Sequence, residues 1–178
     1  MRHEIQLVGI GGQGVRLAST ILSRACGIYD GKKVAETHLY GAEARGGLSE
    51  SELVMSDGDI YYVKVQNPDY LIALSQFAYD EYSHQVKNEG TIIADDFYVE
   101  SYDVNDTRLK LFPLTRVALD EVGAKIAVNV VALGVLSALD SFLNPESMRR
   151  AVGDLIKKRF VEKNLIAFDK GFEIGERG

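Results

Sequence analysis

Residues 4–15 read EIQLVGIGGQGV, and this stretch decides the fold. Its first half, Glu4–Gly9, is an apolar strand, and from Val15 onward apolar residues recur at helical spacing. The glycines between them match the pattern G-x-G-x-x-G at Gly9, Gly11 and Gly14. Glycine lets the backbone turn sharply and approach a ligand, while unpaired amides at a helix start attract phosphate. The stretch therefore predicts a strand, an anion-binding turn and a helix.

The chain that follows predicts a Rossmann-like βαβ unit. Gly31 ends the helix, and Lys33–Thr37 reads as a second strand parallel to the first, joined by a right-handed crossover. Glu36 follows Gly14 by about 20 residues, where a dinucleotide fold keeps its ribose-binding acid. An NAD- or FAD-binding module is therefore an alternative, as is a glycine turn that serves packing alone. Against the dinucleotide fold, a glycine-rich loop and not a second helix follows Glu36.

The rest of the chain predicts a mostly parallel sheet. Leu48–Met55 and Ile60–Val65, around a Ser-Asp-Gly-Asp turn, are typical of a β-hairpin. Tyr70–Leu74 and Thr91–Ala94 read as buried strands, with a helix over 76–86 between them. A further strand is expected at Leu109–Phe112.

Helices dominate the expected C-terminal part. One begins at Thr115, whose hydroxyl is placed to cap it. The apolar run Ala127–Leu139 predicts a helix buried against the sheet or against a partner, and a homodimer through this run stays open. Asn144 caps a last helix with Pro145 at its first position. The fold class is thus α/β with a Rossmann-like start, a mostly parallel sheet with a β-hairpin insertion, and packed helices, forming a single domain over 1–178.

Composition limits the function classes. A chain of 178 residues fits one domain, and a net charge of -6 with a pI near 5.1 argues against nucleic acid as a partner. No stretch reaches the roughly 18 apolar residues of a membrane span, and no basic, apolar leader opens the chain, so a cytoplasmic location is expected. The single cysteine, Cys26, predicts a buried structural thiol and cannot build an iron–sulfur cluster.

A second loop, residues 40–47 (YGAEARGG), is a candidate binding segment. It places Arg45 among small residues, which exposes the guanidinium to a carboxylate or phosphate. The residues alone leave open a flexible surface loop in which Glu43 and Arg45 are solvated.

Both motifs, with Asn129 ahead of Ala132-Leu133-Gly134, resemble the gamma subunit of 2-oxoacid:ferredoxin oxidoreductases over nearly the whole chain. The resemblance implies a share in converting a 2-oxoacid and coenzyme A to acyl-CoA and CO2, with electrons passed to ferredoxin. Thiamine diphosphate and [4Fe-4S] clusters would lie in alpha, beta and delta type partner subunits only. Pyruvate, 2-oxoglutarate, branched-chain oxoacids and indolepyruvate all remain open as the oxoacid. No catalytic residue is assigned to this chain.

The resemblance also implies the site residues. This domain would bind coenzyme A, through backbone amides, the Gln13 side chain and the charge of Arg45, and help assemble the complex. The full set of expected binding residues is Gly9, Gly11, Gly12, Gln13, Gly14, Tyr40, Glu43, Arg45, Gly46 and Gly47. Two alternatives stand beside the subunit: an autonomous NAD- or FAD-binding module, and an assembly protein with a vestigial glycine turn.

Other polar residues carry weaker hypotheses. His38 next to Tyr40 has the chemistry of a general acid or base, although the family resemblance places catalysis elsewhere. Asp95-Asp96 after a strand is read as a solvated turn, and no metal is assigned. His3 and His84 suggest no function.

Overall fold

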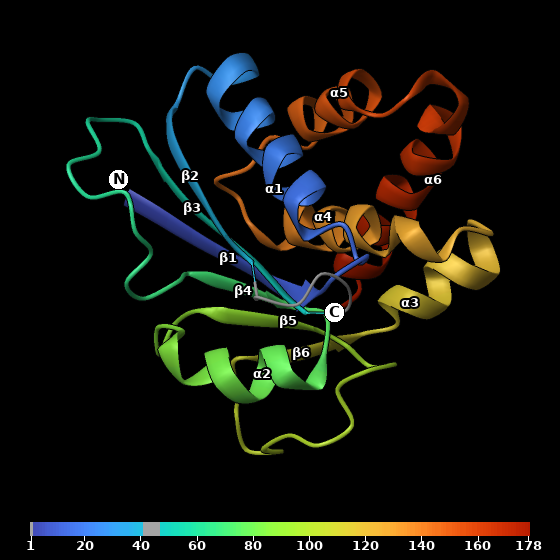
Figure 1. Cartoon of the computed structure of the whole chain (residues 1–178), viewed down its shortest axis with the longest axis horizontal. Coiled ribbons are helices and arrows are strands. Elements are labelled where there is room, and N and C mark those ends of the chain that lie inside the picture. The colour runs from blue at the N-terminus through green and yellow to red at the C-terminus, as the bar shows by residue number, and fades with distance from the viewer. Residues whose placement is uncertain (1, 41–46) are drawn as a thin grey trace.

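The computed structural model describes residues 2–40 and 47–178, with the backbone alone at Tyr40. Six strands form one sheet in the order β2-β3-β1-β4-β5-β6 (Figure 1). Their bounds are β1 Arg2–Ile10, β2 Lys33–Tyr40, β3 Leu48–Ser56, β4 Tyr70–Ala73, β5 Thr91–Asp95 and β6 Leu109–Phe112. The three strands predicted after residue 69 are confirmed to within one residue at each end.

The sheet is parallel apart from β3. Strands β1, β4, β5 and β6 pair in parallel, whereas β3 lies antiparallel between β1 and β2. Strand β2 therefore runs in the same direction as β1, as predicted, but it pairs with β3 and not with β1. Strand β3 is inserted between the two strands of the βαβ unit. The apolar periodicity of β1 and β2 does not predict this strand order.

The predicted hairpin is wrong in its partner. Strand β3 forms its hairpin with β2, and Ile60–Val65 is not a strand. Arg2 holds this segment instead, donating from Nη1 to the Tyr62 carbonyl at 2.6 Å and from Nη2 to the Lys64 carbonyl at 2.8 Å. Both edges of β3 are already paired, so no edge is left to this apolar segment.

The helices cover the two faces unequally. Helices α1, α4, α5 and α6 lie on one face of the sheet and α2 on the other (Figure 1). Their bounds are α1 Val15–Arg24, α2 Gln76–Tyr82, α3 Leu114–Arg116, α4 Val128–Leu139, α5 Pro145–Leu155 and α6 Lys158–Gly175. Short helical turns add Ala25–Tyr29, Ser83–Gln85, Val117–Glu121 and Lys125–Ala127.

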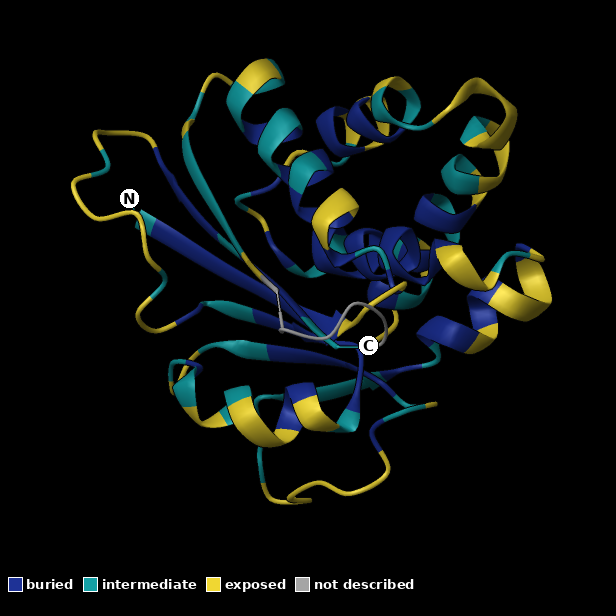
Figure 2. Ribbon diagram, in the orientation of Figure 1, coloured by how far each residue is buried: buried dark blue, intermediate teal, exposed yellow. Residues whose placement is uncertain are grey.

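Helix α4 is the centre of the larger core. All residues of 128–137 are buried, as Figure 2 shows in dark blue, and the chain's own α6 packs against it. The predicted buried helix is confirmed, but its use as a homodimer surface is wrong because the same chain covers it. The crossing is close: a Cβ on Gly134 would overlap the Phe168 carbonyl, and one on Gly171 the Val131 carbonyl.

Two helix starts test the predicted caps. Asn144 caps α5, its Oδ1 accepting from the Glu146 amide at 3.0 Å, with Pro145 first in the helix. The cap predicted at Thr115 is wrong. Helix α3 starts one residue earlier, and the Thr115 hydroxyl donates to Asp95 Oδ2 at 2.5 Å. A hydrogen bond from the hydroxyl to a charged, buried carboxylate is stronger than one that the hydroxyl would accept from a backbone amide of the helix.

Candidate functional site

A cavity of about 350 Å³ opens where the parallel strands end. It is lined by the turn after β1, by the segments after β5 and β6, and by the start of α4. The lining residues are Ile10, Gly11, Gly12, Gln13, Tyr98, Thr115, Lys125, Ile126 and Val128. Chain connections leave β1 and β4 toward opposite faces of the sheet, so this is the switch point at which open α/β sheets bind ligands.

The glycine turn after β1 is built as predicted. Gly12 has φ +97° and Gly14 has φ +75°, a region that favours glycine. A Cβ on Gly9 would lie 2.5 Å from Gln13 Oε1, and one on Gly14 would lie 2.6 Å from Asn129 Nδ2. Two of the motif's glycines therefore allow close approach, and Gly12 allows the turn.

Gln13 shapes this turn from inside. Its Oε1 accepts from the Ile10 amide at 2.7 Å, and its Nε2 donates to the Leu74 carbonyl at 2.7 Å, which ties the end of β1 to the end of β4. The side chain is buried. One N–H of Nε2 is therefore used within the chain and the other has no partner among the described residues, so the predicted role of Gln13 as a donor to the ligand stays a prediction.

The backbone amides divide into paired and unpaired groups. Gly11 donates to the Gly47 carbonyl at 2.8 Å, so this amide is not available to a ligand. In the described part of the chain, no acceptor lies against the amides of Gly12 or Gly14, and no side chain caps α1. These amides and the first turn of α1 are the donors that remain for an anion.

The second predicted motif meets the first. The Gly11–Gly47 bond places Gly47 beside the end of β1. Ser49 of β3 pairs with Gly9 on one side and with Tyr40 on the other, so Tyr40 lies at the same end of the sheet, with β3 between it and β1. Gly41, Glu43, Arg45 and Gly46 lie outside the described residues, so their predicted roles stay predictions.

Asn129, the third part of the motif, also reaches the turn. Its Nδ2 donates to the Gly14 carbonyl at 3.0 Å across 115 positions of sequence. The asparagine is buried at the start of α4. It therefore joins α4 to the glycine turn and fixes the orientation of the last glycine.

Outside the glycine turn, sequence reasoning missed five residues that line the cavity: Tyr98, Thr115, Lys125, Ile126 and Val128. They come from two segments, 97–116 and 125–128, with no motif to connect them. The amphipathic mixture of an aromatic ring, a hydroxyl, an amine and an aliphatic side chain is typical of a small-molecule site. No local pattern signals it, because the residues meet only through the sheet.

Asp95 holds the wall that carries Thr115. The carboxylate is fully buried and accepts from the Thr115 amide at 3.2 Å and the Phe97 amide at 3.3 Å. Burial raises the pKa of Asp95, against the lowering effect of these hydrogen bonds. The expected solvated turn is thus wrong for Asp95, while the partly exposed Asp96 pairs with Arg116 at 2.8 Å.

Glu36 and His38 face α1 and β3, not the cavity. Glu36 accepts from Ser19 at 2.6 Å and from Ser23 at 2.8 Å, which engages the carboxylate that a dinucleotide fold would offer to ribose. His38 Nδ1 lies 2.8 Å from Ser51 Oγ, and its Nε2 lies 3.3 Å from Glu36 Oε1. The relay between His38 and Tyr40 involves a side chain outside the described part.

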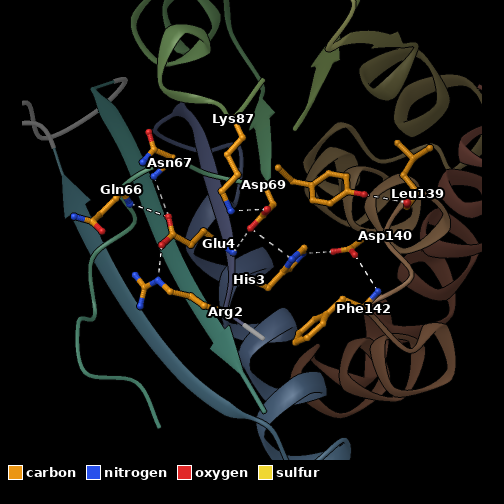
Figure 3. Close-up of polar contacts among 11 residues, drawn as sticks. Arg2, His3, Glu4, Gln66, Asn67, Asp69, Lys87, Leu139, Asp140 and Phe142 are labelled. Carbon is orange, nitrogen blue, oxygen red and sulfur yellow. Dashed lines mark hydrogen bonds and ion pairs between the residues drawn. The ribbon is translucent and has the colours of Figure 1, made fainter. Parts of the chain in front are cut away.

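His3 is an unexpected polar centre at the other end of β1 (Figure 3). It is buried, with Nε2 2.6 Å from Asp140 Oδ2, and its ring stacks on Phe142 at 4.7 Å. The expectation of an ordinary polar position is wrong for this residue. On its other side Nδ1 lies 3.5 Å from Asp69 Oδ2, so His3 joins the loop after α4 and the segment before β4 to β1.

Cys26 is fully buried, and burial raises the pKa of its thiol to about 12, as expected of a structural cysteine. Within 2–40 and 47–178, no three His, Cys, Asp or Glu side chains are grouped to hold a metal ion. The helices in those ranges are all too short or too polar to span a bilayer.

A glycine turn at the switch point, open amides and a cavity beside them define an α/β domain of the anion- or nucleotide-binding class. The family model described as pyruvate ferredoxin/flavodoxin oxidoreductase matches residues 4–174. The 2-oxoglutarate synthase subunit KorC of Methanocaldococcus jannaschii is 43% identical over 178 residues, covering 99% of this chain and 95% of that subunit.

Two solved structures share the fold. The gamma subunit of a keto/oxoacid ferredoxin oxidoreductase from Geobacter sulfurreducens is 38% identical, with a TM-score of 0.88 over 97% of this chain and 95% of that one. The 2-oxoglutarate:ferredoxin oxidoreductase of Magnetococcus marinus, solved with 2-oxoglutarate, coenzyme A and succinyl-CoA, is 22% identical. Its TM-score is 0.88 over 99% of this chain and 31% of that chain, a likeness of fold.

The chain belongs to the pyruvate ferredoxin/flavodoxin oxidoreductase family, as a gamma subunit of a 2-oxoacid:ferredoxin oxidoreductase. It is accordingly part of an oxidoreductase.

Proposed function

We propose that this subunit binds coenzyme A at the cavity beside the glycine turn, and that it serves a complex oxidising 2-oxoglutarate. The observation that carries the binding proposal is a pair of amides, at Gly12 and Gly14, that have no acceptor among the described residues. Gly12 lines a cavity of about 350 Å³, and Gly14 stands at the start of α1, which no described side chain caps. A pyrophosphate is the part of coenzyme A that such amides recognise. The choice of 2-oxoglutarate rests on the KorC relative.

Among the other predicted binding residues, some shape the glycine turn and others are proposed to contact the ligand. Gly9 and Gly14 allow the close packing, Gln13 braces the turn, and Gly11 and Gly47 join the two motifs. Tyr40, Glu43, Arg45 and Gly46 are proposed to complete the site, with Arg45 contacting either the ligand or a partner subunit near thiamine diphosphate. Arg45→Ala should weaken coenzyme A binding or turnover of the complex. Unchanged affinity and turnover would remove Arg45 from the site.

The chemistry of decarboxylation and electron transfer is assigned to partner subunits. Thiamine diphosphate supplies the carbanion chemistry and [4Fe-4S] clusters carry the electrons, in alpha, beta and delta type subunits that pass them to ferredoxin. A chain with one cysteine, buried at 26, has no ligand set for a cluster. We infer for residues 1–178 a single gamma-type domain, working in the cytoplasm, that presents coenzyme A to the acyl group and supports assembly.

The autonomous dinucleotide module loses its main support. Glu36, the acid on which it rested, is engaged by serines of α1. Binding of NAD by the isolated chain would restore that alternative, so NAD belongs in the test.

The test is calorimetric titration of the full chain with coenzyme A and, separately, with NAD. Gly12→Val should abolish coenzyme A binding, because the branched side chain would occupy the open turn in which the ligand is proposed to bind. A Cβ at Gly12 meets no atom within 4 Å, so the substitution causes no steric clash within the protein. Gly31→Val is the matched control: Gly31 has φ +67° and equally open surroundings, but it does not line the cavity. Both variants carry the same backbone strain of about 1–3 kcal/mol.

The assembled oxidoreductase provides the second measurement. If the isolated chain binds no coenzyme A, the KM for coenzyme A in the complex should still rise at least tenfold in Gly12→Val and stay constant in Gly31→Val. An unchanged KM in Gly12→Val would refute the binding proposal. Faster turnover with pyruvate than with 2-oxoglutarate would refute the substrate proposal.

A further inference from the structure

Lys125 is a cation of the cavity that has no anionic partner in the described part of the chain. It stands in the turn Lys125–Ala127, directly before α4, and lines the cavity with Gly11 and Gly12. Among the described residues, no carboxylate forms an ion pair with its ammonium group. Nζ lies over the Tyr98 ring, 5.4 Å from its centroid. Lys125 is exposed, and its ammonium beside the open amides gives the cavity positive potential from two independent sources.

The two sources suit two different anionic groups. Backbone amides at the start of α1 form a concave cradle for a pyrophosphate, whereas a lysine is a point charge that binds a single phosphate through its three donors. They come from different segments, Gly12–Gly14 after β1 and Lys125 before α4. A ligand that carries two separate anionic groups can use both sources.

The charge and the aromatic surface of the cavity indicate which end of coenzyme A enters. About 350 Å³ lies near the lower limit of ligand sites, which span about 300–1,000 Å³. The nucleotide end carries a pyrophosphate, a 3′-phosphate and an adenine ring within a compact unit, and the half-buried ring of Tyr98 offers it an aromatic surface. The pantetheine arm is uncharged and extended, so it has no use for a lysine.

Resting on the proposed function, we propose that Lys125 binds the 3′-phosphate of coenzyme A and so makes this site prefer coenzyme A over ligands without that group. Both 3′-dephospho-coenzyme A and NAD lack the 3′-phosphate while keeping a pyrophosphate and an adenine. Lys125 is therefore a specificity residue, and the glycine turn binds the group that all three ligands share.

The test compares coenzyme A with 3′-dephospho-coenzyme A, by Kd on the full chain and by KM in the assembled oxidoreductase. The wild type should prefer coenzyme A by about tenfold, the range of one charge-assisted contact. Lys125→Met should lose this preference by weakening coenzyme A alone, with 3′-dephospho-coenzyme A unchanged within about twofold. Lys125→Arg should keep most of the preference, since the positive charge is retained. Added salt should reduce the preference of the wild type.

Lys33→Met is the control for the loss of one positive charge. Lys33 is exposed at the start of β2, at the opposite end of the sheet from the glycine turn. This variant should keep the wild-type preference.

Contrary outcomes are distinct. Equal weakening of both ligands by Lys125→Met would mean that Lys125 contacts the shared pyrophosphate, and unchanged affinity for both would mean that it contacts neither; each overturns the proposal. If Gly12→Val weakens both ligands while Lys125→Met weakens neither, the coenzyme A site stands and only the Lys125 assignment falls. If neither variant changes either ligand, both the site and the assignment fall.

Discussion

The two ends of β1 differ in whether the polar groups there have hydrogen-bond or ion-pair partners. At the amino end, His3 and Glu4 are buried and their side chains are engaged by Asp140, Arg2 and the loop after residue 65 (Figure 3). At the carboxyl end, the amides of Gly12 and Gly14 and the ammonium of Lys125 have no such partners among the described residues.

This is the difference expected between groups that stabilise the fold and groups that bind the proposed ligand. A buried polar group without a partner costs about 1–3 kcal/mol, so the amino end must be fully paired to be stable. The carboxyl end opens onto a cavity, where water meets the same need until a ligand replaces it. Substitutions at the amino end should therefore change stability, and those at the carboxyl end should change binding.

The largest effect is expected for Glu4→Ala. Glu4 Oε2 accepts from the Gln66 amide at 2.8 Å and the Asn67 amide at 3.0 Å, while its Oε1 accepts from Arg2 Nε at 2.6 Å. Removal leaves these donors unpaired and should lower the free energy of unfolding by about 3–5 kcal/mol, measured by urea denaturation. Glu4→Gln keeps an acceptor and should lose less than half as much. Equal losses would show that packing, not pairing, matters here.

His3→Ala should follow, with a loss of about 2–3 kcal/mol. The substitution removes the contact with Asp140 and the stacking on Phe142, and it leaves a buried carboxylate with one partner fewer. His84→Ala is the control, since His84 is exposed on the turn after α2, and it should change stability by less than about 0.5 kcal/mol. Similar losses in both variants would contradict the pairing argument.

The pH dependence of stability tests the environment of Asp95 in the wall of the cavity. Because its pKa is raised in the folded protein, the folded state binds the proton more tightly than the unfolded state, and stability should fall as pH rises through the window above about 4. The neighbouring Asp96 adds to the rise, while Thr115 and Phe97 oppose it. Asp95→Asn should remove this component, so the stability of the wild type relative to the variant should increase as pH is lowered from 7 toward 4. A constant difference across that range would show that the carboxyl does not titrate there.

The smallest effect compares two arginines of α1. Arg16 lies in the first turn, where a cation opposes the helix dipole, and Arg24 lies in the last turn, where it is favourable and donates to the Tyr29 hydroxyl at 3.1 Å. Arg16→Gln should stabilise the unliganded protein by about 0.3 kcal/mol, and Arg24→Gln should destabilise it by about 0.5 kcal/mol. Thermal unfolding at low salt measures both. Effects of the same sign would exclude the dipole as their cause.

Sequence reasoning was most successful where the signal is local. The glycine turn, the three parallel strands after residue 69 and the Asn144-Pro145 helix start each depend on a few neighbouring residues. Helix α6 was left unassigned although Val161, Leu165, Phe168 and Phe172 recur at helical spacing. That pattern was available and would have predicted it.

Errors arose where partners are distant. Ile60–Val65 has the composition of a strand but no free sheet edge to join, since β1 and β2 already occupy both edges of β3. Thr115 has the chemistry of a cap but lies next to a buried carboxylate 20 positions away. In both cases a neighbour distant in sequence competed with the local preference and won.

The sequence by itself determined the α/β class, the anion-binding turn and the family, because backbone conformation at glycines and apolar periodicity are properties of short segments. Only the tertiary structure decided that Gln13 braces the turn, that Asn129 fixes Gly14, and that Lys125 joins the cavity. These relations depend on the strand order and on the position of α4, which bring together residues separated by more than 60 positions. Burial and charge pairing act through space, so they become definite only when the sheet is assembled.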